Sequence, residues 1–215
     1  MKEIPILFST PMVQAIIADR KTETRRTRGL DLINKNPDDW ELKGFGGNPS
    51  IEKDRRPCAY FNKKESDTWT YVISPYGKPG NLLWVRETFI LQDGIYKYLA
   101  DNTDWKGIIK FKPSIHMPKT AARVWLKVID IKVERLEYIT ETSAIAEGVQ
   151  IGKGLDNSNW YLDYQTNLFQ LFKAKSSFNT LWRKINGEDS YNSNPWVWVV
   201  KFEVVSKNGK PIINQ

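Results

Sequence analysis

The chain has 215 residues, with 32 Lys and Arg against 25 Asp and Glu and a formal net charge of +7. A chain of this length removes about 70% of its unfolded surface from water, so it can fold without disulfides, and its one cysteine, Cys58, excludes an internal one. No stretch approaches the roughly 18 consecutive apolar residues of a membrane span, and no apolar signal segment follows Met1. We therefore expect a cytoplasmic protein with one domain over residues 1–215 and no membrane partner.

Aromatic residues accompany the positive charge: the chain has nine Trp, nine Tyr and nine Phe. Basic groups attract phosphates, and aromatic rings beside them stack on bases. Core packing is the alternative role for any single ring. The combination favours a nucleic acid or a nucleoside as the partner.

The first predicted elements are a buried strand over residues 5–9 and a helix over about residues 10–19. Thr10 and Pro11 form a typical helix start, and apolar residues follow at helical spacing. The helix leads into a basic run over residues 20–26. From about 29 to 66, Asn, Asp, Lys, Gly and Pro dominate, which predicts an irregular surface insertion; residues 44–49 in particular are not expected to form regular structure.

The middle of the chain is rich in strand patterns. Residues 68–73 and 82–87 are predicted strands on either side of a Pro- and Gly-containing turn. Residues 96–100 are predicted to pair with 108–111 across a loop, and 121–135 to form a long, bent strand.

The last part of the chain contributes two predicted helices and a strand. A capped helix is expected over 140–147, ending at Gly148, a second over about 167–185, and a final strand over 196–202. Strands dispersed among a few helices predict an α+β fold around a small barrel.

Several of these segments resemble the ASCH domain family, whose members share a PUA-like β-barrel. Residues 18–26 (ADRKTETRR) resemble the family's "GRKT.T.R" segment, and 79–87 (PGNLLWVRE) its "pG..lwVrE" turn and strand. Residues 130–148 are similar to the strand and helix that follow, and 113–118 and 194–199 to pieces of phage and prophage members. The resemblance implies a PUA-like (ASCH) barrel with flanking helices, and it covers the insertion at about 29–66 least.

ASCH domains as a class are viewed as RNA- or nucleotide-binding modules. We expect no cofactor for this chain. A small bacterial member resembles an amidohydrolase that removes acetate from N4-acetylcytidine with a lysine, a threonine and a glutamate. When the resembling segments are matched, the lysine, threonine and glutamate of that member correspond to Lys21, Thr24 and Glu147. A threonine hydroxyl needs a base to become a nucleophile, and a desolvated lysine can serve as that base. A carboxylate can position the lysine or carry a proton to the leaving amine.

Further candidates for contacts with nucleic acid lie in the basic run and near two aromatic segments. The run contains Arg20, Arg25 and Arg26, which are typical of a phosphate clamp or of a solvated face. Arg86 is a candidate for a phosphate contact or a buried ion pair, and Trp84 shares its face of the strand.

His116 is the only histidine, and it is a further candidate for contact with nucleic acid: we expect it to line the pocket, to stack on a base or to make a structural loop contact. One histidine and one cysteine make a metal site improbable, and we expect none.

Three hypotheses follow. The first is binding of RNA, single-stranded DNA or a modified nucleoside in a cleft between the barrel and the 10–19 helix, floored by Lys21, Thr24, Arg25 and Arg86. The second is hydrolysis of an acylated cytidine in the same cleft. The third is a phage assembly or host-interaction protein that uses the insertion and a Trp-rich surface.

Overall fold

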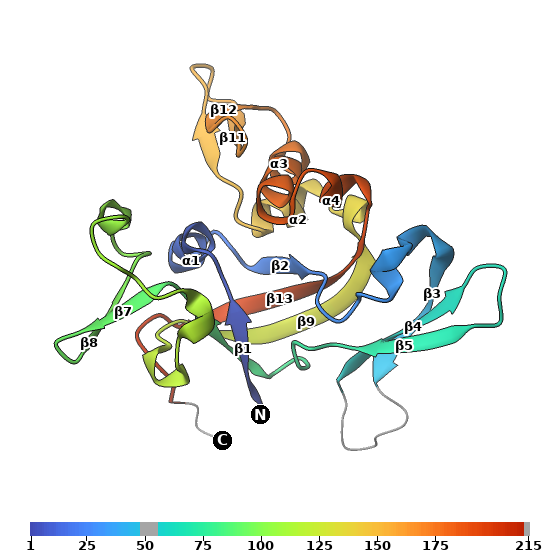
Figure 1. The fold of residues 1–215 in the computed structure, drawn as a ribbon. Helices are drawn as coiled ribbons and strands as arrows, with labels where there is room; N and C mark the ends of the chain where they lie inside the picture. Colours follow the sequence, from blue (N-terminus) through green and yellow to red (C-terminus); the bar gives the residue numbers. More distant parts are fainter. Residues whose placement is uncertain (48–55, 213–215) are drawn as a thin grey trace.

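The fold is built on a five-stranded sheet with the strand order β1-β6-β9-β13-β2 (Figure 1). The computed structural model describes residues 1–47 and 56–212. The strands of this sheet are β1 (Glu3–Leu7), β2 (Glu23–Arg26), β6 (Leu82–Arg86), β9 (Trp125–Arg135) and β13 (Trp196–Ser206). Only β1 and β6 pair in parallel. The edge strands β1 and β2 do not pair with each other in the described ranges, so the sheet is not closed into a barrel.

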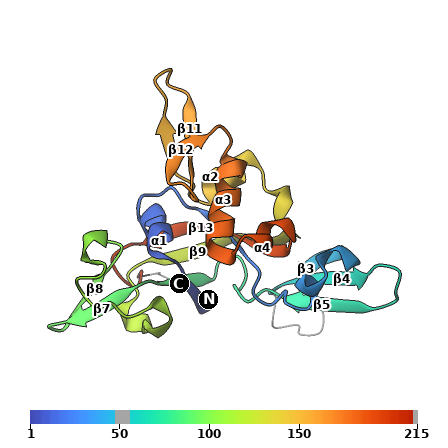
Figure 2. The same ribbon diagram turned by 45° about the horizontal axis from the view of Figure 1, so that its top comes forward.

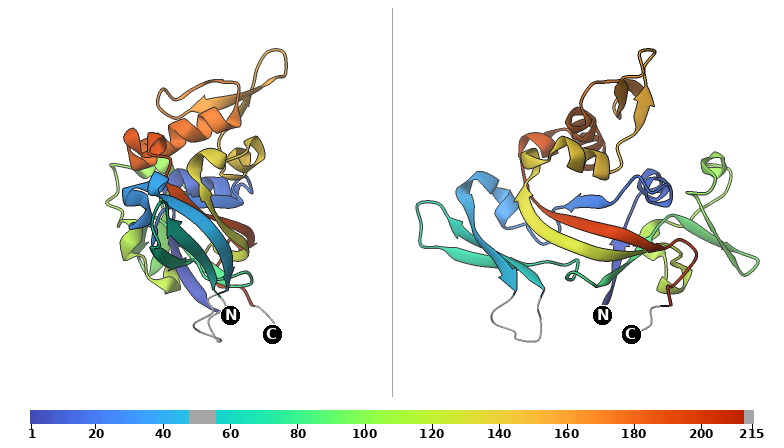
Figure 3. Two further views of the ribbon diagram at one scale, coloured as in Figure 1. Left: turned by 90° about the vertical axis from the view of Figure 1, so that its right-hand side faces the viewer. Right: turned by 180° about the vertical axis from the view of Figure 1, so that it is seen from behind.

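The two long central strands, β9 and β13, carry the core, and they lie side by side along a common curve (Figure 3). The predicted strand over 196–202 is confirmed and extends to Ser206. Its residues 196–200 are all buried, with Trp198 and Val200 in the main core and Val197 and Val199 in a second cluster on the opposite face. A strand covered on both faces needs a continuous apolar run rather than alternation.

The helices are α1 (Thr10–Ile17), α2 (Glu141–Ala146), α3 (Ala174–Asn186) and α4 (Asp189–Asn192). The predicted helices at 10–19 and 140–147 are confirmed, the second with a cap in which the Thr140 side chain accepts from the amide of Ser143. Strands and helices together confirm the α+β class. None of the helices in the described ranges is long and apolar enough to cross a membrane.

Shorter elements connect these strands and helices. Single 3-10 turns occupy Ile33–Lys35, Pro37–Asp39, Thr103–Trp105, Ser114–His116, Lys119–Ala121 and Leu136–Tyr138.

The segment at 29–66 is not the irregular insertion that its composition predicts. It forms β3 (Trp40–Gly47) and β4 (Pro57–Lys63), which join β5 (Trp69–Ile73) in an antiparallel sheet that projects from the body (Figure 2). The glycines that suggested a loop belong to β3, where Gly44 follows a shift in register and lies opposite Tyr60, as glycines at a bulge do. Residues 48 and 49 of the predicted loop lie outside the described ranges.

This segment is also part of the core rather than a surface covering. Leu30, Ile33 and Phe61 are fully buried in the main cluster. The ring of Phe61 packs edge-on against Trp196 of β13, with the centroids 5.1 Å apart.

The predicted pairing of 96–100 with 108–111 is wrong. β8 (Ile95–Tyr98) pairs instead with β7 (Phe89–Gln92). The two residues between them, Asp93 and Gly94, have φ values of 52° and 77°, as a tight hairpin turn with a right-handed twist requires.

The predicted helix over 167–185 is wrong in its first part. Residues 168–171 form β12 (Leu168–Leu171), which completes a small sheet with β10 (Ile151–Lys153) and β11 (Asn159–Asp163). Asn167, with a φ of 60°, ends the turn between β11 and β12. The helix α3 begins only at Ala174, whose amide donates to Oε2 of Glu141 over 2.7 Å.

Candidate functional site

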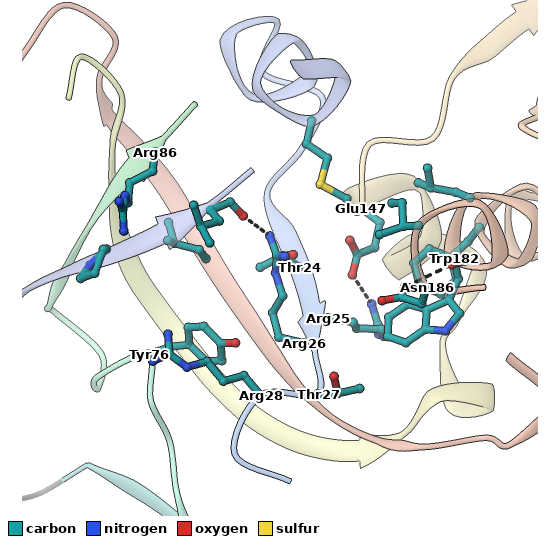
Figure 4. Close-up of a pocket in the computed structure, with 17 residues that line it drawn as sticks. Thr24, Arg25, Arg26, Thr27, Arg28, Tyr76, Arg86, Glu147, Trp182 and Asn186 are labelled. Atoms are coloured by element: carbon teal, nitrogen blue, oxygen red, sulfur yellow. Dashed lines mark hydrogen bonds and ion pairs between the residues drawn. The ribbon is translucent and has the colours of Figure 1, made fainter. Parts of the chain in front are cut away.

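A pocket of about 270 Å³ opens beside strand β2, between β1 and the C-terminal half of α3 (Figure 4). We call it the β2 pocket. Its polar and aromatic wall is made by Thr24, Arg25, Arg26, Thr27, Arg28, Tyr76, Arg86, Glu147, Phe178, Trp182 and Asn186. Pro5, Ile6, Leu7, Met12, Leu181 and Ile185 complete it with apolar groups. The expected cleft beside α1 is thus present only in part, because α1 contributes Met12 alone and α3 forms the opposite wall.

Lys21 and Glu147 form a buried ion pair behind this wall. Nζ of Lys21, which is fully buried, donates to Oε2 of Glu147 over 2.6 Å, to the Glu147 carbonyl over 2.7 Å and to the Glu23 carbonyl over 2.9 Å. Burial lowers the pKa of Lys21, and the charge of Glu147 opposes that shift. Lys21 therefore reaches the pocket only through Glu147, which lines it.

The turn after α2 brings Glu147 to this position. Gly148 has a φ of 87°, a left-handed conformation that ends helices and favours glycine. A Cβ at Gly148 would lie 2.9 Å from Cβ of Lys21 and 3.1 Å from Cβ of Ala15. The close approach of these backbones depends on glycine.

Carboxylates pair with the NH1 and NH2 atoms of Arg25, while its buried Nε has no hydrogen-bond partner among the described residues. Its NH1 donates to Glu23 over 2.7 Å and to Glu147 over 3.2 Å, and its NH2 donates to Glu134 over 2.8 Å. Lys132 also contacts Glu134, at 2.6 Å. Arg25 and Lys21 together hold the two oxygens of Glu147 in place.

Three other arginines of the pocket, Arg26, Arg28 and Arg86, form no salt bridge with any described residue. Arg26 donates from NH2 to the Leu7 carbonyl over 2.7 Å, and Arg86 donates from NH2 to the carbonyl of Ile115. The Nε atoms of Arg26 and Arg86 are buried and have no hydrogen-bond partner among the described residues. Burial lowers the pKa of Arg26. These guanidinium groups keep unused donors at the pocket.

The wall formed by α3 is apolar and aromatic. Trp182 is buried, and its Nε1 has no partner in the described part of the chain. Asn186 lies one helical turn later and donates to the Trp182 carbonyl over 3.1 Å. Neither residue was predicted as a site residue, and Asn186 follows the end of the helix predicted over about 167–185. Their four-residue spacing, which places both on one face, was the available signal.

The remaining predicted residues lie elsewhere. Arg20 is exposed and donates to the carbonyl of Gly148 over 3.2 Å, outside the pocket. His116 is exposed and borders a separate shallow depression with Tyr96. Trp84 packs into a different apolar cluster, and its ring lies 5.6 Å from the Arg86 guanidinium. The structure thus gathers Lys21, Thr24, Glu147, Arg25, Arg26 and Arg86 around one pocket, without Arg20 or His116.

Comparisons with protein-family models, with curated proteins and with solved structures gave no match to this chain. Within the described ranges, no group of three or more His, Cys, Asp or Glu side chains is arranged to hold a metal ion.

Proposed function

We propose that the chain binds a nucleoside, free or within RNA or single-stranded DNA, in the β2 pocket. One observation carries this proposal. Four buried N–H donors of pocket residues have no partner among the described residues: the Nε atoms of Arg25, Arg26 and Arg86, and Nε1 of Trp182. Nearly all buried polar groups in proteins are hydrogen-bonded. A group of unused donors around one cavity is therefore best explained by a ligand that brings acceptors.

The shape and chemistry of the pocket suit a nucleoside. A volume of about 270 Å³ is close to the lower end of the usual range for small-molecule sites. Trp182 and Phe178 offer rings for stacking on a base. The side chain of Asn186 and the Glu147 carboxylate offer hydrogen-bonding groups for a base edge.

The proposal agrees with the resemblance to ASCH domains, and we propose that the chain is a member of the phage and prophage type with a PUA-like core. The segments that carry the resemblance supply β2, β6 and the β9–α2 unit. Thr24, Arg86 and Glu147, which come from these segments, all line the pocket.

Binding can be tested by calorimetric titration with N4-acetylcytidine and with a short single-stranded RNA. We expect Arg26→Gln to weaken RNA binding about tenfold or more, as the loss of a charged hydrogen bond does. Affinity for RNA should also fall as salt rises. Arg20→Gln is the matched control, since Arg20 belongs to the same basic run but lies outside the pocket. No binding of either ligand by folded protein would refute the proposal.

A second candidate function is hydrolysis of the acetyl amide of N4-acetylcytidine, favoured by the position of Glu147 between Lys21 and the pocket that Thr24 lines. In this scheme the Thr24 hydroxyl attacks the acetyl carbon, and Glu147 passes its proton to a neutral Lys21. The C–N bond breaks as the same route returns the proton to N4 and releases cytidine. Water then hydrolyses the threonine ester, which releases acetate. The scheme requires the Lys21–Glu147 ion pair to give up a proton before the attack, and burial lowers the pKa of Lys21 in that direction, against the charge of Glu147.

Turnover of N4-acetylcytidine, followed by chromatography, separates this candidate from binding alone. We expect Thr24→Ala to abolish cytidine formation, and Thr22→Ala, which changes an exposed threonine two residues away, to leave it unchanged. Binding without turnover would refute the hydrolase and leave the binding proposal intact.

A further inference from the structure

We infer that Arg26, Arg28 and Arg86 form a phosphate subsite at one end of the β2 pocket, so that its ligand is a nucleotide rather than a bare nucleoside. This inference rests on the proposed function and specifies the class of ligand. The phosphate belongs either to a free mononucleotide or to the backbone of a strand.

The first argument is the local balance of charge. On one side of β2, Lys21 and Arg25 are matched by the carboxylates of Glu23, Glu134 and Glu147. The three arginines of the subsite have no such partner in the described ranges. A partly buried charge without a counter-ion is costly, which applies to Arg26 and Arg86, and the exposed Arg28 adds a third positive charge to the lining of the same cavity. An anion in that cavity would compensate them.

The second argument is that two of these guanidinium groups are held in fixed positions. Arg26 lies over the ring of Phe8, 4.9 Å from its centroid, and Arg86 lies over Trp84 at 5.6 Å. Each is also tied by NH2 to a backbone carbonyl. Stacking and one hydrogen bond orient each planar group, while its Nε lacks a partner in the described part of the chain. Guanidinium groups fixed in this way lose little further freedom when they bind a phosphate.

The third argument is the separation between the two ends of the pocket. In Figure 4, Arg86, Arg28 and Tyr76 lie on one side of β2, and Trp182 and Asn186 lie on the other. A ligand that spans this space needs an anionic end and a planar end. A phosphorylated nucleoside has both, and a phosphate monoester carries about −1.5 to −2 charges at pH 7. A nucleoside alone would leave the three arginines uncompensated.

The test is a set of calorimetric titrations with cytidine and N4-acetylcytidine, each with and without a 5′-phosphate, and with a short single-stranded oligocytidine. We expect the 5′-phosphate to tighten binding by about tenfold or more. Arg28→Gln should remove most of this gain, and because Arg28 is exposed the fold should be unaffected. Arg20→Gln, at an equally exposed arginine outside the pocket, should leave the gain unchanged.

The outcomes separate this inference from the proposed function. Nucleoside binding that gains nothing from a phosphate, in either the mononucleotide or the oligonucleotide, would overturn the phosphate subsite alone. No binding of any of these ligands would overturn both proposals. Tighter binding of the mononucleotide identifies a free nucleotide as the source of the phosphate, and tighter binding of the oligonucleotide identifies a strand; each supports the subsite.

Discussion

Arg25 and Arg26 are adjacent in the sequence and have different surroundings. Arg25 points its guanidinium into three carboxylates, whereas Arg26 meets an aromatic ring and one carbonyl. Successive side chains of a strand point to opposite faces, so β2 divides a basic run into a structural part and an open part. The sequence shows the run, but the separation depends on Glu134 and Glu147, which lie more than 100 positions away in the chain.

The carboxylates around Arg25 should make stability depend on acid. Burial acts to raise the pKa of Glu134, but hydrogen bonds from Lys132 and Arg25 outweigh it and hold the pKa below 4.5. A carboxyl whose pKa is lower in the folded state than in the unfolded state stabilises the fold. Its full contribution is present above the unfolded-state pKa and is lost as pH falls through the folded-state pKa. The relevant window therefore lies below about pH 4.5.

We predict that Glu134→Gln lowers the free energy of unfolding by about 1–3 kcal/mol at pH 7, the range for hydrogen bonds to charged groups. The difference from the wild type should shrink as pH falls below 4.5. Urea unfolding at a series of pH values measures it. A difference that stays constant down to pH 2 would contradict the lowered pKa of Glu134 in the folded protein.

At the scale of elements, sequence patterns predict the helices and strands that are set by local signals. The helices at 10–19 and 140–147 and the strands at 68–73, 82–87 and 196–202 carry caps, turns or apolar runs that act within a few residues, and the structure contains them. The prediction for the segment at 29–66 is wrong because its glycines and polar residues take part in the pairing of β3, β4 and β5, which its composition does not show. Its buried residues, such as Ile33, are scattered among polar ones and form no period.

We predict that Ile33→Ala lowers the free energy of unfolding by about 2–5 kcal/mol, because Ile33 is fully buried in the main cluster. Leu32→Ala, one residue earlier and 56% exposed, is the control and should change it by about 0.5 kcal/mol or less. Chemical denaturation compares the two variants. Equal, small effects would show that this segment does not belong to the core.

The turn after α2 gives a second prediction at this scale. Gly148→Ala should destabilise the fold by more than about 1 kcal/mol, since it adds a clash with Lys21 to the strain of a positive φ. Gly107→Ala is the matched control: Gly107 has a φ of 85°, with nothing within 4 Å of the added Cβ, so it bears the backbone strain alone. Thermal unfolding of the two variants should rank Gly148→Ala as the more damaging, and the reverse order would contradict the close packing at Lys21.

For the whole molecule, the sequence predicts the α+β class and most of one side of the β2 pocket, and it misses the other side. Thr24, Arg26 and Arg86 come from segments with a recognisable pattern. Trp182 and Asn186 come from a helix whose face looks like ordinary core, and only the packing of α3 beside β2 turns them toward the cavity. The pocket exists because elements distant in the sequence meet, which no local pattern encodes.

The most direct test of the nucleoside pocket is a nuclear magnetic resonance titration that follows the indole N–H signals of the nine tryptophans. The Trp182 signal is identified by its loss in Trp182→Phe. We predict that N4-acetylcytidine 5′-monophosphate shifts this signal, because the Trp182 N–H has no partner among the described residues and lies at the pocket. The signal of Trp69, which is exposed on β5, should keep its position. A Trp182 signal that stays unmoved at saturating ligand would contradict the assignment of the β2 pocket as the binding site.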